Sequence, residues 1–138
     1  VMILTEMNHD ARIVRLNGEH RRARAASWFG DSIGYWEGDT LVVKTRHFGE
    51  FPPLSGADSN LQATEYFTRQ ADGSMRYRFL VENLEIWTQP WGGEYVWASS
   101  EGKIYEYACH EGNYALGNIM RGARELEKES LAVQAGAD

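Results

Sequence analysis

The feature that most constrains the fold is a succession of short segments with strand-like alternation, separated by turn residues. Gly38-Asp39 separates residues 32–37 from residues 40–48, and Ala71-Asp72-Gly73 occupies a similar place further along the chain. Both arrangements predict β-hairpins, because these residues tolerate the backbone geometry of tight turns. No helical pattern alternates with the segments, which argues against a parallel sheet joined by helices.

The remaining elements follow from the same patterns. Further strands are predicted over residues 1–7, 11–16, 62–70, 74–83, 84–88, 94–99 and 103–109. The apolar spacing then becomes helical and predicts one helix over residues 113–129, with Asn113 as its cap. Residues 49–60 carry two prolines and two glycines, and they predict a long surface loop that is a candidate lid.

Together these elements predict an all-β fold with one C-terminal helix, in a single domain over residues 1–138. An antiparallel meander of this length usually curls, because closure removes exposed strand edges. We therefore expect the meander to close into a lipocalin-like barrel. A barrel of about eight strands either fills with side chains or holds one small ligand.

Composition excludes some functions. The net charge of −6 and the pI near 5.2 argue against a general nucleic-acid binder, which needs positive potential. No apolar run approaches the roughly 20 residues of a membrane span. The strand pattern that begins at residue 1 predicts that the natural chain extends upstream, or that a leader of an exported protein was removed.

Aromatic residues give the best functional hint. Five Trp, seven Tyr and five Phe are spread over many predicted strands, and Tyr77 and Phe79 alternate with Arg76 and Arg78. We expect the aromatic set to face inward and to line a pocket for an apolar or aromatic molecule. The candidate ligand-binding residues are Trp28, Trp36, Tyr66, Tyr77, Trp87, Trp97 and Tyr107.

Four residues are candidates for proton transfer: Asp31, Glu65, Glu106 and His110. A carboxylate against apolar walls can act as an acid or base near neutral pH. Each also has a structural interpretation. Glu65, for example, could pair with Arg76 or Arg78 on the neighbouring strand.

The stretch around Glu106 leaves two orientations open. If residues 103–110 form a strand, Tyr105 and Tyr107 share one face, and Glu106 and His110 share the other. The apolar pattern favours the tyrosines pointing inward and Glu106 outward. The alternative places Glu106 in the cavity as an acid–base residue.

Metal and cysteine chemistry have little support. No two of the four histidines lie at the spacing that makes a local metal site, so we predict neither a metal nor another cofactor. Cys109 and His110 are adjacent, so their side chains leave a strand on opposite faces and do not activate one another.

The stretch SWFGDSIGYWEGDTLVVKTRHF at residues 27–48, together with EYACHEGNY at residues 106–114, resembles an uncharacterised bacterial protein family. Many members of that family are longer and exported. The resemblance implies a shared fold but no reaction. This chain has Gln62 where those proteins often have histidine, and His20-Arg21 where they often have His-Pro.

Three functions are compatible with these features. The first is an enzyme that performs cofactor-free acid–base chemistry of the lyase, isomerase or hydrolase type on a small apolar or aromatic molecule. The second is a non-catalytic module that binds such a molecule. The third is an accessory domain with a filled barrel. A homodimer is compatible with each.

Overall fold

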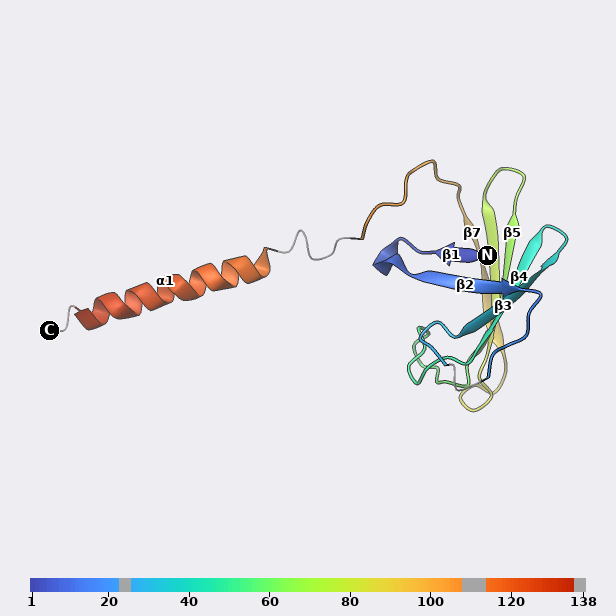
Figure 1. Ribbon diagram of the computed structural model, residues 1–138, viewed down its shortest axis with the longest axis horizontal. Coiled ribbons are helices and arrows are strands. Elements are labelled where there is room, and N and C mark those ends of the chain that lie inside the picture. The colour runs from blue at the N-terminus through green and yellow to red at the C-terminus, as the bar shows by residue number, and fades with distance from the viewer. Residues whose placement is uncertain (23–25, 108–113, 136–138) are drawn as a thin grey trace. The chain divides into compact units, whose positions relative to one another are not determined.

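The computed structural model describes residues 1–22, 26–107 and 114–135, in two units, Val1–Ile104 and Tyr105–Asp138. The first unit contains a seven-stranded sheet and a short 3-10 helix, and the second contains one α-helix (Figure 1). The elements are β1 (Met2–Leu4), η1 (Met7–His9), β2 (Ala11–Leu16), β3 (Asp31–Glu37), β4 (Thr40–Arg46), β5 (Gln62–Arg69), β6 (Met75–Glu82), β7 (Trp91–Trp97) and α1 (Ala115–Ala135).

The sheet follows chain order from β1 to β7 and curls into a half-barrel (Figure 1). The expectation of a β-rich, curled sheet with one C-terminal helix is therefore confirmed. The strands were expected to be antiparallel throughout, and this is wrong at one place, since β2 and β3 are parallel. Residues 17–30 connect these two strands, and a connection of this length allows the chain to cross over and run in the same direction.

Two predicted strands are absent from the described chain. Residues 84–88 form turns, with the N–H groups of Ile86 and Trp87 both bonded to the carbonyl of Asn83. Residues 103–107 form no strand, and residues 108–109 lie outside the described residues, as does the predicted helix cap Asn113. The sheet thus has fewer strands than the pattern suggested, and it ends at β7 instead of at the segment that contains Glu106.

The β3–β4 hairpin turns where the sequence predicted it. Gly38 has a φ of 56°, in the left-handed region that glycine adopts without strain, and Glu37 and Thr40 pair on either side of the turn. The β5–β6 hairpin turns in the same manner at Gly73, whose φ is 84°.

Two buried apolar clusters lie on one face of the sheet, which we call the inner face and define by Val14, Val43 and Val81. Val14 and Val43 form one buried cluster with Leu41, towards the hairpin turns. Val81 forms a second buried cluster with Phe48 and Leu61, towards the opposite end of the strands. Glu65 pairs with Phe79 across the ladder and lies between the two clusters on the same face.

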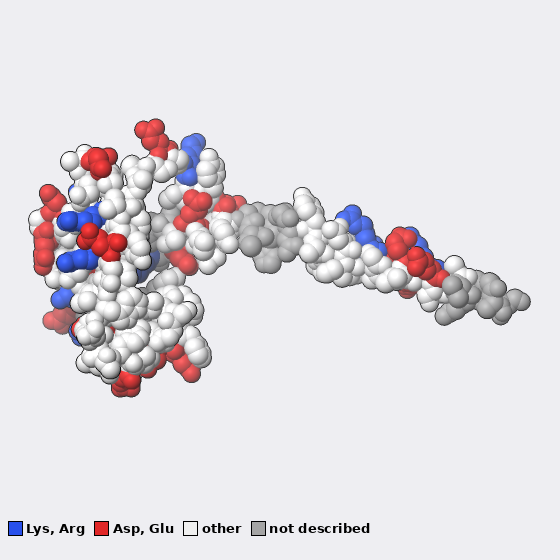
Figure 2. Space-filling view, turned by 180° about the vertical axis from the view of Figure 1, so that it is seen from behind, with Lys and Arg blue, Asp and Glu red and all other residues white. Residues whose placement is uncertain are grey.

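The outer face is polar and mixed in charge. Arg78 lies 4.1 Å from the centre of the Tyr66 ring, a cation–π contact, and Thr40 and Thr68 share a hydrogen bond. In Figure 2, basic and acidic side chains are interspersed over the sheet-containing unit on the face in view. None of the helices in the described part of the chain is long and apolar enough to cross a membrane.

Candidate functional site

A pocket of about 390 Å³ opens on the inner face, over the second buried cluster. This volume is within the range of sites that bind small molecules. Its walls come from β5, β6 and β7 and from the loops around residues 29, 48 and 54. The lining residues are Arg12, Phe29, Phe48, Pro53, Leu54, Leu61, Ala63, Glu65, Tyr77, Phe79, Val81, Trp91 and Tyr95.

Most of this lining is apolar or aromatic because alternate residues of each strand face the pocket. Tyr77, Phe79 and Val81 of β6 all line it, while the alternating residues Arg76 and Arg78 are exposed. The predicted inward orientation of the β6 aromatic residues is therefore confirmed.

The aromatic rings form a connected wall. The Phe79 ring is stacked with that of Tyr95 at 6.2 Å between centres, and it meets Trp91 edge-on at 5.9 Å. The Tyr77 ring stacks on Trp97 at 4.6 Å. Each such ring pair contributes roughly 1 kcal/mol beyond its burial, so the wall is held in place by its own contacts.

Three polar side chains meet at the floor of the pocket. Arg12 donates two hydrogen bonds to Glu65, at 2.7 Å to Oε2 and 3.0 Å to Oε1. The Tyr77 hydroxyl donates a third to Glu65 Oε1 at 2.9 Å. Arg12 is on β2 and Glu65 on β5, with β3 and β4 between them in the sheet, so the ion pair spans the inner face.

Glu65 does not pair with Arg76 or Arg78, as one interpretation of the sequence had suggested. Arg76 and Arg78 are opposite Thr68 and Tyr66 in the ladder, on the outer face, whereas Glu65 is opposite Phe79. The true partner lies 53 residues away in the sequence, and neighbouring-strand reasoning does not reach that far.

Tyr77 is a neutral donor at physiological pH. Burial raises the pKa of the Tyr77 phenol well above its ordinary value, and the charge of the Glu65 carboxylate raises it further. The phenol therefore keeps its proton, and its hydrogen bond to Glu65 persists through the neutral range.

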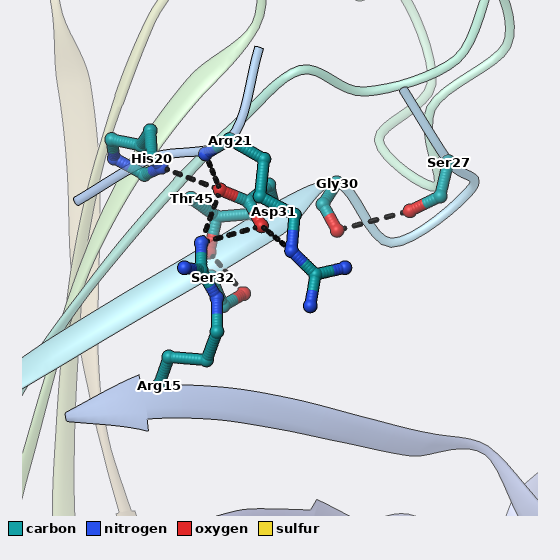
Figure 3. A network of polar contacts seen from close by, with 8 residues as sticks. All are labelled: Arg15, His20, Arg21, Ser27, Gly30, Asp31, Ser32 and Thr45. Carbon is teal, nitrogen blue, oxygen red and sulfur yellow. Dashed lines mark hydrogen bonds and ion pairs between the residues drawn. The ribbon is translucent and has the colours of Figure 1, made fainter. Parts of the chain in front are cut away.

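Asp31 is the centre of a second polar cluster, shown in Figure 3. Arg15 Nη2 donates to both carboxylate oxygens at 2.8 Å, and the backbone N–H of Arg21 donates to Oδ2 at 2.8 Å. His20 Nδ1 lies 3.2 Å from the same oxygen. The cluster ties the segment after β2 to the start of β3. A proline at position 21 could not donate this backbone bond, because proline has no N–H group.

These contacts change the acidity of Asp31. Burial by itself would raise its pKa, but the hydrogen bonds from Arg21, His20 and Arg15 and the charge of Arg15 outweigh it, so the pKa lies below the usual value of 3.8. A depressed folded-state pKa stabilises the fold above the unfolded value, and the contribution disappears as the pH falls through the folded value.

We expect Asp31→Asn to lower the free energy of unfolding by about 2 kcal/mol at pH 6, since it removes a buried charge from its cationic partners. The difference from the wild-type protein should shrink as the pH falls below 3.8. Urea unfolding of both proteins between pH 2 and pH 6 measures it. A difference that stays constant over this range would contradict the account of Asp31.

The other predicted site residues lie elsewhere. Trp28 and Trp36 are more than half exposed, and Tyr66 is on the outer face under Arg78. Trp87 meets the pocket residue Trp91 edge-on at 5.3 Å without lining the pocket. Glu106 and Tyr107 belong to the second unit, and His110 lies outside the described residues.

The structure thus brings together two predicted residues, Glu65 and Tyr77, in one pocket. Arg12, Phe79, Trp91 and Tyr95 also line this pocket and were not among the predicted site residues. Phe79 was expected to face inward from its alternation with Arg78, although it was not named as a ligand-binding residue. Arg12 had no such signal, because only the packing of β2 across the inner face places it beside Glu65.

Two further hollows are more polar. One of about 600 Å³ is lined mainly by polar side chains around His47, Gln62 and Glu82, and one of about 230 Å³ lies beside Asp31. The described residues include no group of three or more His, Cys, Asp or Glu side chains that could hold a metal ion. The 390 Å³ pocket is therefore the better candidate for an organic ligand, because it combines an aromatic wall with a few convergent polar groups.

No protein-family model, no curated protein and no solved structure matches this chain. The family resemblance of the sequence therefore stays a prediction.

Proposed function

We propose that the protein binds a small, largely apolar molecule in the pocket on the inner face of its half-barrel, without transforming it. The observation that carries this proposal is the lining, in which aromatic and aliphatic side chains surround a single polar floor. Burying a ring against such a wall is favourable by about 25 cal/mol for each Å² removed from water.

The candidate acid–base residue in this pocket favours binding over catalysis. Both oxygens of Glu65 already accept hydrogen bonds, two from Arg12 and one from Tyr77. A general base must contact a proton of the substrate. The oxygens of Glu65 that would accept this proton already accept hydrogen bonds from Arg12 and Tyr77. The acid–base enzyme is thus the weaker candidate, since it requires Glu65 to exchange these partners for substrate.

The loop that carries Pro53 and Leu54 supports a binding role, because both residues line the pocket. Asp58 of this loop accepts a hydrogen bond from Asn83 Nδ2 at 2.8 Å, and this anchors the loop to the end of β6. Leu54 and Ala57 pack against the second buried cluster. The loop at residues 49–60 thus forms one wall, and its opening as a lid stays a prediction.

Filling the pocket should weaken binding. We expect Ala63→Leu to weaken binding of the neutral fluorescent probe N-phenyl-1-naphthylamine at least tenfold, or about 1.4 kcal/mol, because Ala63 lines the pocket and the larger side chain takes its space. Titration of the probe, followed by its emission, gives the affinity.

Thr64→Leu is the matched control, since Thr64 is the next residue and faces the outer surface opposite Leu80. It should leave the probe affinity unchanged. If the wild-type protein does not bind the probe, or if both variants bind it as the wild type does, the pocket is not the binding site.

A further inference from the structure

The polar side chains at the pocket floor differ in how many hydrogen bonds they can still make to a ligand. Glu65 is 7% exposed and accepts three hydrogen bonds. The proton of the Tyr77 hydroxyl is directed at Glu65. The Glu65 carboxylate and the Tyr77 hydroxyl therefore make most of their hydrogen bonds with each other and with Arg12.

Arg12 has N–H groups that can donate hydrogen bonds to a ligand. A guanidinium has five N–H groups, and two of those of Arg12 are directed at Glu65. The Arg12 side chain keeps 21% of its surface exposed and lines the pocket. The floor consequently presents donors of hydrogen bonds to an incoming molecule, set in an apolar wall.

The charges at the pocket floor also limit the charge that a ligand can carry. Arg12 and Glu65 neutralise each other, so the floor carries no net charge. An anionic group that approached Arg12 would come close to the Glu65 carboxylate, and a cationic group that approached Glu65 would come close to Arg12. Either approach adds like-charge repulsion in a partly buried site, where charges are weakly screened.

We infer that the ligand is an uncharged aromatic molecule with a carbonyl group, such as an aryl ketone or aryl ester, whose carbonyl oxygen accepts a hydrogen bond from Arg12 while its ring packs against Phe79 and Trp91. This inference rests on the proposed binding function and adds the chemical class of the ligand. A hydrogen bond from a charged donor is worth more than one between neutral groups, which gives the oxygen a measurable effect.

Four naphthalenes of matched size test the class on the wild-type protein, by displacement of bound N-phenyl-1-naphthylamine. They are 2-acetonaphthone, 2-ethylnaphthalene, 2-naphthoate and 2-naphthylmethylammonium. The ketone should bind roughly tenfold tighter than the apolar compound, the value of one hydrogen bond to a charged donor. It should also bind at least tenfold tighter than either ion.

The variant Arg12→Lys gives a second test with the same compounds. It keeps the positive charge that balances Glu65 and loses the planar set of N–H donors of the guanidinium. We expect the ratio between the affinities for the ketone and for 2-ethylnaphthalene to fall towards unity in this variant. If this variant does not fold, the comparison of the four compounds on the wild-type protein still decides the matter.

The outcomes separate the two proposals. Absence of N-phenyl-1-naphthylamine binding would overturn the binding function and the ligand class together. Binding of the probe with equal affinities for the ketone and 2-ethylnaphthalene would overturn the ligand class and leave the binding function standing. Tighter binding of 2-naphthoate would also overturn the class, since it would assign an anion to Arg12.

Discussion

Replacing Arg12 by methionine should lower the free energy of unfolding by about 3 kcal/mol, the low end of the range for breaking a buried ion pair. The change leaves the Glu65 carboxylate, 7% exposed, without its cation on the inner face. Methionine keeps much of the apolar stem of Arg12, so the loss reports the charge and its two hydrogen bonds. Urea unfolding at pH 7 measures it.

The double variant Arg12→Met with Glu65→Gln should recover at least half of this loss. It removes both charges and retains a carbonyl oxygen that can accept the hydrogen bond from Tyr77. Replacing both members of a buried pair is far less costly than removing one, because no uncompensated charge stays behind.

Arg76→Met is the matched control for the single change, because Arg76 is exposed on the outer face of the sheet. Its effect should stay within about 0.5 kcal/mol. A loss below about 1 kcal/mol for Arg12→Met would mean that water screens Glu65, and the pocket floor could then not discriminate between ligands by charge.

Local patterns accounted for the sheet better than for the site. The turns at Gly38 and Gly73 and the inward orientation of Tyr77 and Phe79 depend on neighbouring residues, so the sequence predicts them directly. The pairing of Arg12 with Glu65 depends on how β2 packs across the inner face, which no local pattern encodes.

The errors have a similar origin. Residues 84–88 include three large apolar residues and are β-prone, but they form turns after Asn83, whose carbonyl accepts hydrogen bonds from two later residues. The parallel pairing of β2 with β3 follows a long connection over residues 17–30, and no sequence pattern predicted a crossover there. Periodicity identifies faces and turns, whereas crossovers and long-range ion pairs are decided by tertiary packing.

Changing Gly92 to alanine should lower the free energy of unfolding of the sheet unit by about 3 kcal/mol, because a Cβ at this position would meet backbone atoms of β6. The added carbon would lie 2.1 Å from the carbonyl oxygen of Phe79 and 3.2 Å from the Cα of Leu80. Backbone atoms cannot move aside as a side chain can, so β7 must shift away from β6. Since β7 carries Trp91 and Tyr95, the pocket wall should be lost with it.

Gly93→Ala is the matched control at the next position. Its Cβ would approach only the edge of the Phe79 ring, at 3.1 Å from Cε1, and a ring can rotate or tilt away. We expect a loss of about 1 kcal/mol or less for this variant, with β7 still paired to β6. Urea unfolding, together with hydrogen exchange of the β7 amides, distinguishes the two. Equal protection of β7 in both variants would show that the close approach at Gly92 does not govern the pairing, and the pocket wall would then need another explanation for its position.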